Sequence, residues 1–98
     1  MANSMILTIP CKPEKLDELL GIMKQALPDT RAYDGCIRCD TWSSEATPGK
    51  LMFFEVWETK AHQEKYFAWR AETGMMDMLG PFLAGEPTVE WLNVHADV

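Results

Sequence analysis

The stretch from residue 51 to residue 58, LMFFEVWE, constrains the fold more than any other part of the sequence. Its aromatic and β-branched residues predict a β-strand, along which side chains alternate between two faces. One face carries Met52, Phe54 and Val56, and the other carries Phe53, Glu55 and Trp57. Both faces are largely apolar, whereas a sheet with one face in water should alternate with polar residues. Both faces of this strand must therefore be covered.

The remaining sequence predicts three more strands and two helices. The strands are expected at residues 5–10, 36–43 and 88–94, and the helices at residues 13–27 and 60–74, with an irregular helical segment at 75–85. The first helix follows from apolar residues at three- and four-residue steps, and Pro28 is expected to stop or kink it.

The order β-α-β-β-α-β predicts an α+β fold of the ferredoxin-like kind, with a four-stranded antiparallel sheet and both helices on one face. Nothing in the chain remains to cover the second face, and a second subunit is the simplest cover. We therefore expect a homodimer formed by sheet-to-sheet packing. A chain of 98 residues predicts one domain over 1–98, in which residues 1–4 form a frayed end.

Composition excludes several classes of function. The formal net charge is −6 and Lys and Arg do not cluster, which argues against nucleic-acid binding. No apolar run approaches about 18 residues, so no membrane helix is expected. The start of the chain, MANS, lacks the basic region and apolar core of a signal peptide, which predicts a cytoplasmic protein.

The three cysteines are Cys11, Cys36 and Cys39, and this odd number argues against a disulfide framework. Cys36 and Cys39 have C-x-x-C spacing inside a predicted strand, where positions three apart point to opposite faces. The two sulfurs would then not share a metal ion, and we expect structural thiols and no metal site.

The second helix carries a stripe of residues at steps of four, three and four. They are His62, Tyr66, Trp69 and Thr73. If the Met52 face meets a partner subunit, then Glu55 and Trp57 face this stripe, and aromatic walls with few polar groups suit a flat aromatic ligand. The alternatives are aromatic core packing, an ion pair of Glu55 with Arg38 or Arg70, and an exposed His62 in the first helical turn.

Four stretches carry a family resemblance. They are CKPEKLDELLGIMKQAL, TRAYDGCIRCDTW, FFEVWETKAHQEKYFAWR and LGPFLAGEPTVEWL. Together they resemble the antibiotic biosynthesis monooxygenase (quinol monooxygenase-like) family of dimeric α+β barrel proteins. The resemblance implies dimers whose sheets pack face to face, a pocket between the sheet and helices of each subunit, and oxidation of phenols or quinols by O2 without metal, flavin or haem.

The sequence departs from this family pattern at three positions. Phe53 stands where some oxygenases have an Asn, four residues before the strand Trp. Haem-degrading members have a His where this chain has Phe67, so the resemblance does not extend to haem degradation. Quinol-oxidising members often have a His where this chain has Tyr66, and an ordinary tyrosine, with a pKa near 10, is a poor base at neutral pH.

The resulting functional hypothesis is a cofactor-independent monooxygenase acting on a small phenolic or quinol compound. Glu55 or His62 would be the base. The substrate would be bound by Phe53, Trp57, Tyr66, Trp69 and Arg70. Two alternatives stay open. One is a non-catalytic dimeric module that binds small molecules or has a stress-related role, and the other is an isomerase on the same fold.

Overall fold

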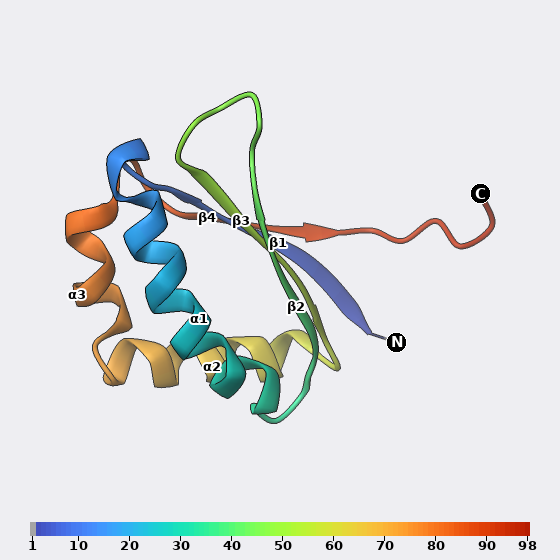
Figure 1. Ribbon diagram of the computed structural model, residues 1–98. Coiled ribbons are helices and arrows are strands. Elements are labelled where there is room, and N and C mark those ends of the chain that lie inside the picture. Colours follow the sequence, from blue (N-terminus) through green and yellow to red (C-terminus); the bar gives the residue numbers. More distant parts are fainter. Residues whose placement is uncertain (1) are drawn as a thin grey trace.

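The computed structural model describes residues 2–98 and has the predicted order of elements (Figure 1). The strands are β1 (Asn3–Pro10), β2 (Cys36–Ser43), β3 (Lys50–Trp57) and β4 (Thr88–Leu92). The helices are α1 (Leu16–Ala32), α2 (Lys60–Glu72) and α3 (Met75–Leu79), with 3-10 turns at Pro13–Lys15 and Gly80–Phe82. The sheet has the order β2-β3-β1-β4, and every neighbouring pair is antiparallel. The predicted ferredoxin-like α+β fold is confirmed.

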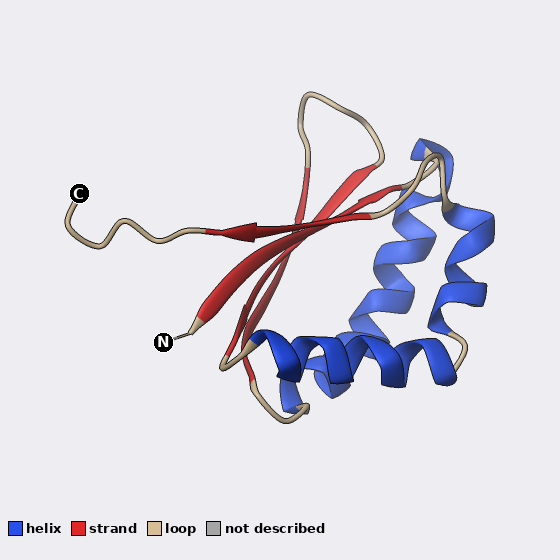
Figure 2. Cartoon of the chain, turned by 180° about the vertical axis from the view of Figure 1, so that it is seen from behind, coloured by secondary structure: helices blue, strands red, loops and turns tan. Residues whose placement is uncertain are grey.

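All helices lie on one side of the sheet, as the two opposite views show (Figures 1 and 2). The segment after β4 extends away from the body of the molecule in both views. The core therefore lies between this helical layer and the face of the sheet that it covers.

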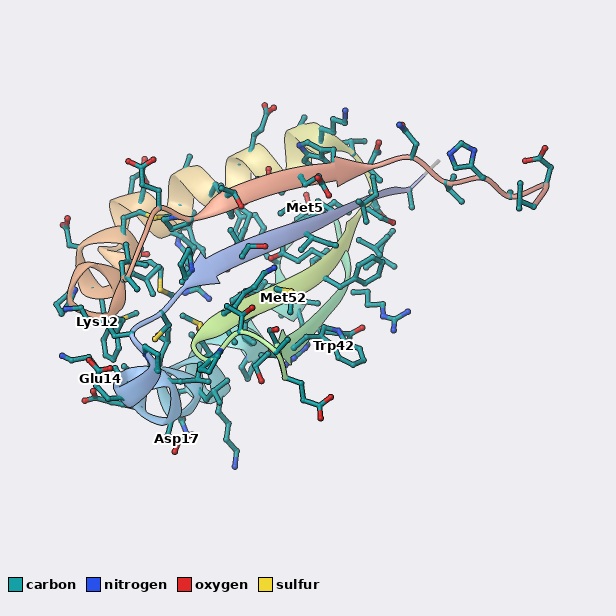
Figure 3. All side chains as sticks on the ribbon, turned by 90° about the horizontal axis from the view of Figure 1, so that it is seen from above. Met5, Lys12, Glu14, Asp17, Trp42 and Met52 are labelled. Carbon is teal, nitrogen blue, oxygen red and sulfur yellow. The ribbon has the colours of Figure 1, made fainter. Side chains whose placement is uncertain are left out.

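The alternation predicted for β3 is confirmed by burial. Phe53, Glu55 and Trp57 are buried on the side of the helices, and Met52, Phe54 and Val56 are only half-buried on the other side. On this open face Met52 pairs with Trp42 of β2 (Figure 3), whose side chain is 59% exposed. Within residues 2–98, no helix or strand packs over this face.

Two expectations about chain boundaries were wrong. Asn3 and Ser4 belong to β1, where they pair with Trp57 and Val56, so they are not a frayed end; Met1 lies outside the described residues. Pro28 does not stop α1, which continues to Ala32; the alternative expectation, a kink at Pro28, stays a prediction. The last turn persists because tertiary contacts described below hold it.

The predicted separation of Cys36 from Cys39 was also wrong. Cys36 pairs with Trp57 and Cys39 with Glu55, and a β-bulge between Cys36 and Arg38 accounts for the shift. Directly paired residues share a face, so both cysteines point toward the helices. All three cysteines are free thiols, and burial, followed by the nearby Glu55, raises the pKa of Cys39 to about 12.

Candidate functional site

A cavity of about 330 Å³ lies between the helices and the covered face of the sheet. Its walls come from β1, β3, the start of β4 and all three helices. Four of the lining residues have polar side chains: Thr30, Glu55, Tyr66 and Arg70. The rest of the wall is apolar, and a small concave site with a few polar groups is typical of small-molecule binding.

Thr30, Tyr66 and Arg70 form a hydrogen-bonded cluster in the cavity wall, which we call the Tyr66 cluster. The hydroxyls of Thr30 and Tyr66 lie 2.5 Å apart. Arg70 Nε donates to Tyr66 Oη at 2.8 Å, and Arg70 Nη2 donates to Thr30 Oγ1 at 3.0 Å and to the carbonyl of Ala26 at 2.8 Å. All three side chains are buried, and the cluster joins α1 to α2 through direct hydrogen bonds.

The electrostatics of the Tyr66 cluster favour a neutral phenol. Burial raises the pKa of Tyr66, although its hydrogen bonds with Arg70 and Thr30 act in the opposite direction. The guanidinium of Arg70 also lies over the ring of Trp69, with 4.6 Å between the guanidinium carbon and the ring centre. Tyr66 can therefore donate or accept a hydrogen bond but is not a base at neutral pH.

Glu55 is the only carboxyl group among the residues that line the cavity, and its residue is 3% exposed. Trp57 Nε1 donates a hydrogen bond to Glu55 Oε1 at 2.9 Å. Burial raises the pKa of Glu55, and the bond from Trp57 partly opposes this rise. The ion pair considered with Arg38 does not form, because Arg38 points to the open face and pairs with Asp40. Glu55 is thus an oriented carboxyl group whose neutral form is favoured by burial.

Phe53, Glu55, Tyr66 and Arg70, all predicted from the sequence, line one cavity. Trp57 and Trp69 lie behind this lining. Trp57 is fully buried and packs on Tyr66 with 5.2 Å between ring centres, and Trp69 stacks on Tyr33 at 5.4 Å. Trp57 bonds Glu55 and the ring of Trp69 lies under Arg70, and neither tryptophan is among the described residues that line the cavity.

His62 does not lie in the cavity. It occupies the first turn of α2, where its Nδ1 is 2.7 Å from the hydroxyl of Thr59. Its ring packs against Gly35, which has a φ of +86°, and a Cβ at Gly35 would lie 2.3 Å from the ring. The expected meeting of His62 with Glu55 is therefore not observed, and His62 instead packs on the turn that precedes β2.

The sequence did not indicate several residues of the wall. Thr30 was missed because α1 was expected to end near Pro28. Phe67 lines the cavity although it lies outside the predicted stripe of α2, and Met23 and Leu27 of α1 had been assigned to the core. The heptad-like spacing of α1 identified its buried side, but it did not distinguish core from cavity wall.

The described part of the chain contains no group of three or more His, Cys, Asp or Glu residues that could hold a metal ion. No helix between residues 2 and 98 has the length and apolar character needed to cross a membrane.

Solved structures with the same fold are known. A conserved protein from Methanosarcina mazei superposes with a TM-score of 0.83 at 19% identity, covering 95% of this chain and 92% of the other. A structure described as an antibiotic biosynthesis monooxygenase superposes with a TM-score of 0.82 at 22% identity, covering 96% and 98%. At these identities the likeness shows a shared fold.

Sequence comparison points the same way. An uncharacterized protein of Synechocystis is 29% identical over 59 residues, which are 60% of this chain and 40% of that protein. The match therefore spans less than half the length of this curated relative. The family model for antibiotic biosynthesis monooxygenase matches residues 4–77, which include all of β1 but its first residue, and the whole of α1, β2, β3 and α2. The chain belongs to the antibiotic biosynthesis monooxygenase family.

Proposed function

We propose that the cavity is the active site of a cofactor-independent monooxygenase that oxidises a small phenol or quinol with O2. The observation that carries this proposal is the carboxyl group of Glu55, which is buried in the cavity wall and has a raised pKa. A carboxylate with a raised pKa is a stronger base than an ordinary one, and a general base is most effective when its pKa is near the working pH. Membership of the family supports the same class of reaction.

In this mechanism Glu55 accepts the proton of a substrate hydroxyl. The 2.9 Å hydrogen bond from Trp57 Nε1 to Oε1 holds the carboxylate in one orientation, so Oε2 is the atom available to the substrate. The resulting phenolate is electron-rich and gives electrons to O2 from a ring carbon, where a C–O bond forms. Apolar walls exclude water from the intermediate.

The reaction balances without another reductant. For a quinol, the ring carbon loses its hydrogen as the O–O bond breaks, one oxygen atom stays in the product as a carbonyl, and the other leaves as water with the proton held by Glu55. The products are a hydroxyquinone and one water, and the four electrons lost by the quinol reduce one molecule of O2. The chain's own tasks are deprotonation, orientation and exclusion of water.

We also infer that the protein is a homodimer formed through the open face of the sheet. Met52, Phe54 and Val56 lie half-buried on that face, and the adjacent Trp42 is 59% exposed. Large exposed apolar patches on small proteins mark interfaces, and a second copy of the same sheet would cover this one.

The proposal is tested by O2 uptake with a panel of substituted hydroquinones and naphthols, together with isotopically labelled O2. We expect one O2 consumed per substrate, with one labelled atom in the product and one in water. Glu55→Gln should lower the rate by about a hundredfold or more. Glu58→Gln, which changes an exposed glutamate just after β3, should leave the rate unchanged. Stoichiometric hydrogen peroxide would refute monooxygenation, and ligand binding without any O2 uptake would favour a non-catalytic binding module.

A further inference from the structure

Arg70 has hydrogen-bonding capacity that the protein leaves unused. A guanidinium has five N–H donors, and three are used: Nε bonds Tyr66, and Nη2 bonds Thr30 and the carbonyl of Ala26. For Nη1, no hydrogen-bond partner is found among residues 2–98. Arg70 is 8% exposed and lines the cavity. An Nη1 without a partner would count as a buried unsatisfied atom if it were fully enclosed, and it does not count as one. Nη1 therefore keeps accessible surface.

Arg70 is also a buried cation without a counter-ion. Its three hydrogen-bond acceptors are neutral oxygens, and none of the ion pairs between residues 2 and 98 includes it. A buried charge costs free energy unless it is paired, and stacking on Trp69 offsets only part of that cost. Glu55, in the same wall, forms its hydrogen bond with Trp57 instead.

We propose that the ligand of this cavity carries a carboxylate that binds Nη1 of Arg70, attached to a flat apolar body that fills the rest of the cavity. Combined with the proposed function, this means that the phenol or quinol that is oxidised is an aromatic acid. The inference rests on the proposed function only in assuming that the substrate binds in this cavity. A free hydrogen on Nη1 can donate to a carboxylate oxygen. A charge-assisted bond of this kind is about twice as strong as a neutral one.

The charge balance of the wall favours a carboxylate over a phosphate. Arg70 is the one cationic side chain among the described residues that line the cavity, so the wall offers a single cation to an anionic ligand. A phosphate ester carries up to two charges and would leave one unpaired in an apolar cavity. The formal net charge of −6 gives no general attraction for anions, so recognition of an acid depends on this local contact.

The test compares two ligands of matched shape, 2-naphthoate and its neutral analogue 2-naphthamide, by titration calorimetry at neutral pH. We expect the wild-type protein to bind naphthoate about tenfold or more tightly than naphthamide. Arg70→Gln should remove this preference, so that the two ligands bind equally. Arg38→Gln, which changes an arginine on the open face of the sheet, should preserve it.

Equal or weaker binding of naphthoate by the wild-type protein would overturn the proposal, as would a preference that persists in Arg70→Gln. If Arg70→Gln does not fold, the comparison of the two ligands on wild-type protein still decides. Neither ligand has a hydroxyl group to oxidise, so the result is independent of O2 chemistry. A wild-type preference for naphthoate without O2 uptake from any hydroxylated naphthoate would support acid recognition while refuting the monooxygenase.

Discussion

Removing one hydroxyl group, in Tyr66→Phe, tests whether the Tyr66 cluster stabilises the fold. The substitution keeps the ring and its packing on Trp57 but deletes the atom that bonds both Thr30 and Arg70. A neutral hydrogen bond contributes about 1 kcal/mol and a bond to a charged group about 1.5–3 kcal/mol. We therefore expect the free energy of unfolding to fall by about 2.5–4 kcal/mol.

Tyr33→Phe is a matched control for this experiment. Tyr33 contacts Tyr66 edge-on, with ring centres 5.2 Å apart, but it is only half-buried, and its hydroxyl reaches the carbonyl of Lys65 at a long 3.5 Å. Its loss should cost no more than about 0.5 kcal/mol. The two proteins are compared by urea unfolding at one protein concentration, because an oligomer's apparent stability depends on concentration.

The double mutant with Thr30→Val separates the pairs within the cluster. Residues in direct contact give non-additive effects, and we expect a coupling of about 1 kcal/mol between Tyr66→Phe and Thr30→Val. If Tyr66→Phe destabilises the protein no more than Tyr33→Phe does, the reasoning is refuted, because the buried Arg70 would not then depend on this hydroxyl.

Three further predictions concern the rest of the molecule. Burial raises the pKa of Glu55 above its ordinary 4.5, so the folded state favours the protonated form. The stability that this group provides is therefore fully present below pH 4.5 and is lost as the pH rises through the raised pKa. Glu55→Gln should remove this loss, so its stability relative to wild type, measured by urea unfolding, should rise with pH; a constant difference would contradict the shift. Sedimentation should give about twice the chain mass of 11.2 kDa, and Val56→Glu on the open face should dissociate or unfold the protein; a wild-type monomer at micromolar concentration would exclude the dimer. In thiol titration at pH 8, Cys36 should react slowly, and the buried Cys11 and Cys39 should react only after unfolding. The reason is that burial raises the pKa of all three thiols. Rapid reaction of Cys39 would show that it is not enclosed.

The orientation of β3 could be predicted from the sequence because it depends on a local rule. Side chains alternate along any strand. Because both faces of β3 are apolar, one face was expected to pack on the helices and the other on a second subunit. Phe53 and Glu55 therefore lie in the cavity wall as expected. The turn of α2 that brings Tyr66 and Arg70 to the same cavity follows from their spacing of four residues.

The exact side of α2 that faces the sheet could not be predicted in the same way. The expected stripe ran through His62, Tyr66 and Trp69, whereas the buried residues of the helix are Gln63, Tyr66 and Arg70. The two stripes share Tyr66 and differ by a rotation of the helix about its axis. Packing against the sheet and α1 fixes this rotation, and such packing overrides a pattern as weakly amphipathic as this one.

The β-bulge in β2 shows a similar limit. One extra residue reverses the alternation beyond it, and here it brings Cys36 and Cys39 to the same face. Neither Gly nor Pro lies within CIRCDTWS to indicate the irregularity. A bulge of this kind follows from the pairing of two strands, so the sequence of one strand does not reveal it.

The continuation of α1 past Pro28 is supported by contacts from α2. Pro28 has no N–H to bond the carbonyl of Lys24, so the turn around it is weakened. Arg70 Nη2 bonds the carbonyl of Ala26, two residues before the proline, and the hydroxyl of Thr30, two residues after it. One guanidinium group thus bridges the weakened turn and holds Thr30 in the cavity wall. A carboxylate on Nη1 would leave both of these bonds in place, so the wall can keep the same form whether the cavity is empty or filled.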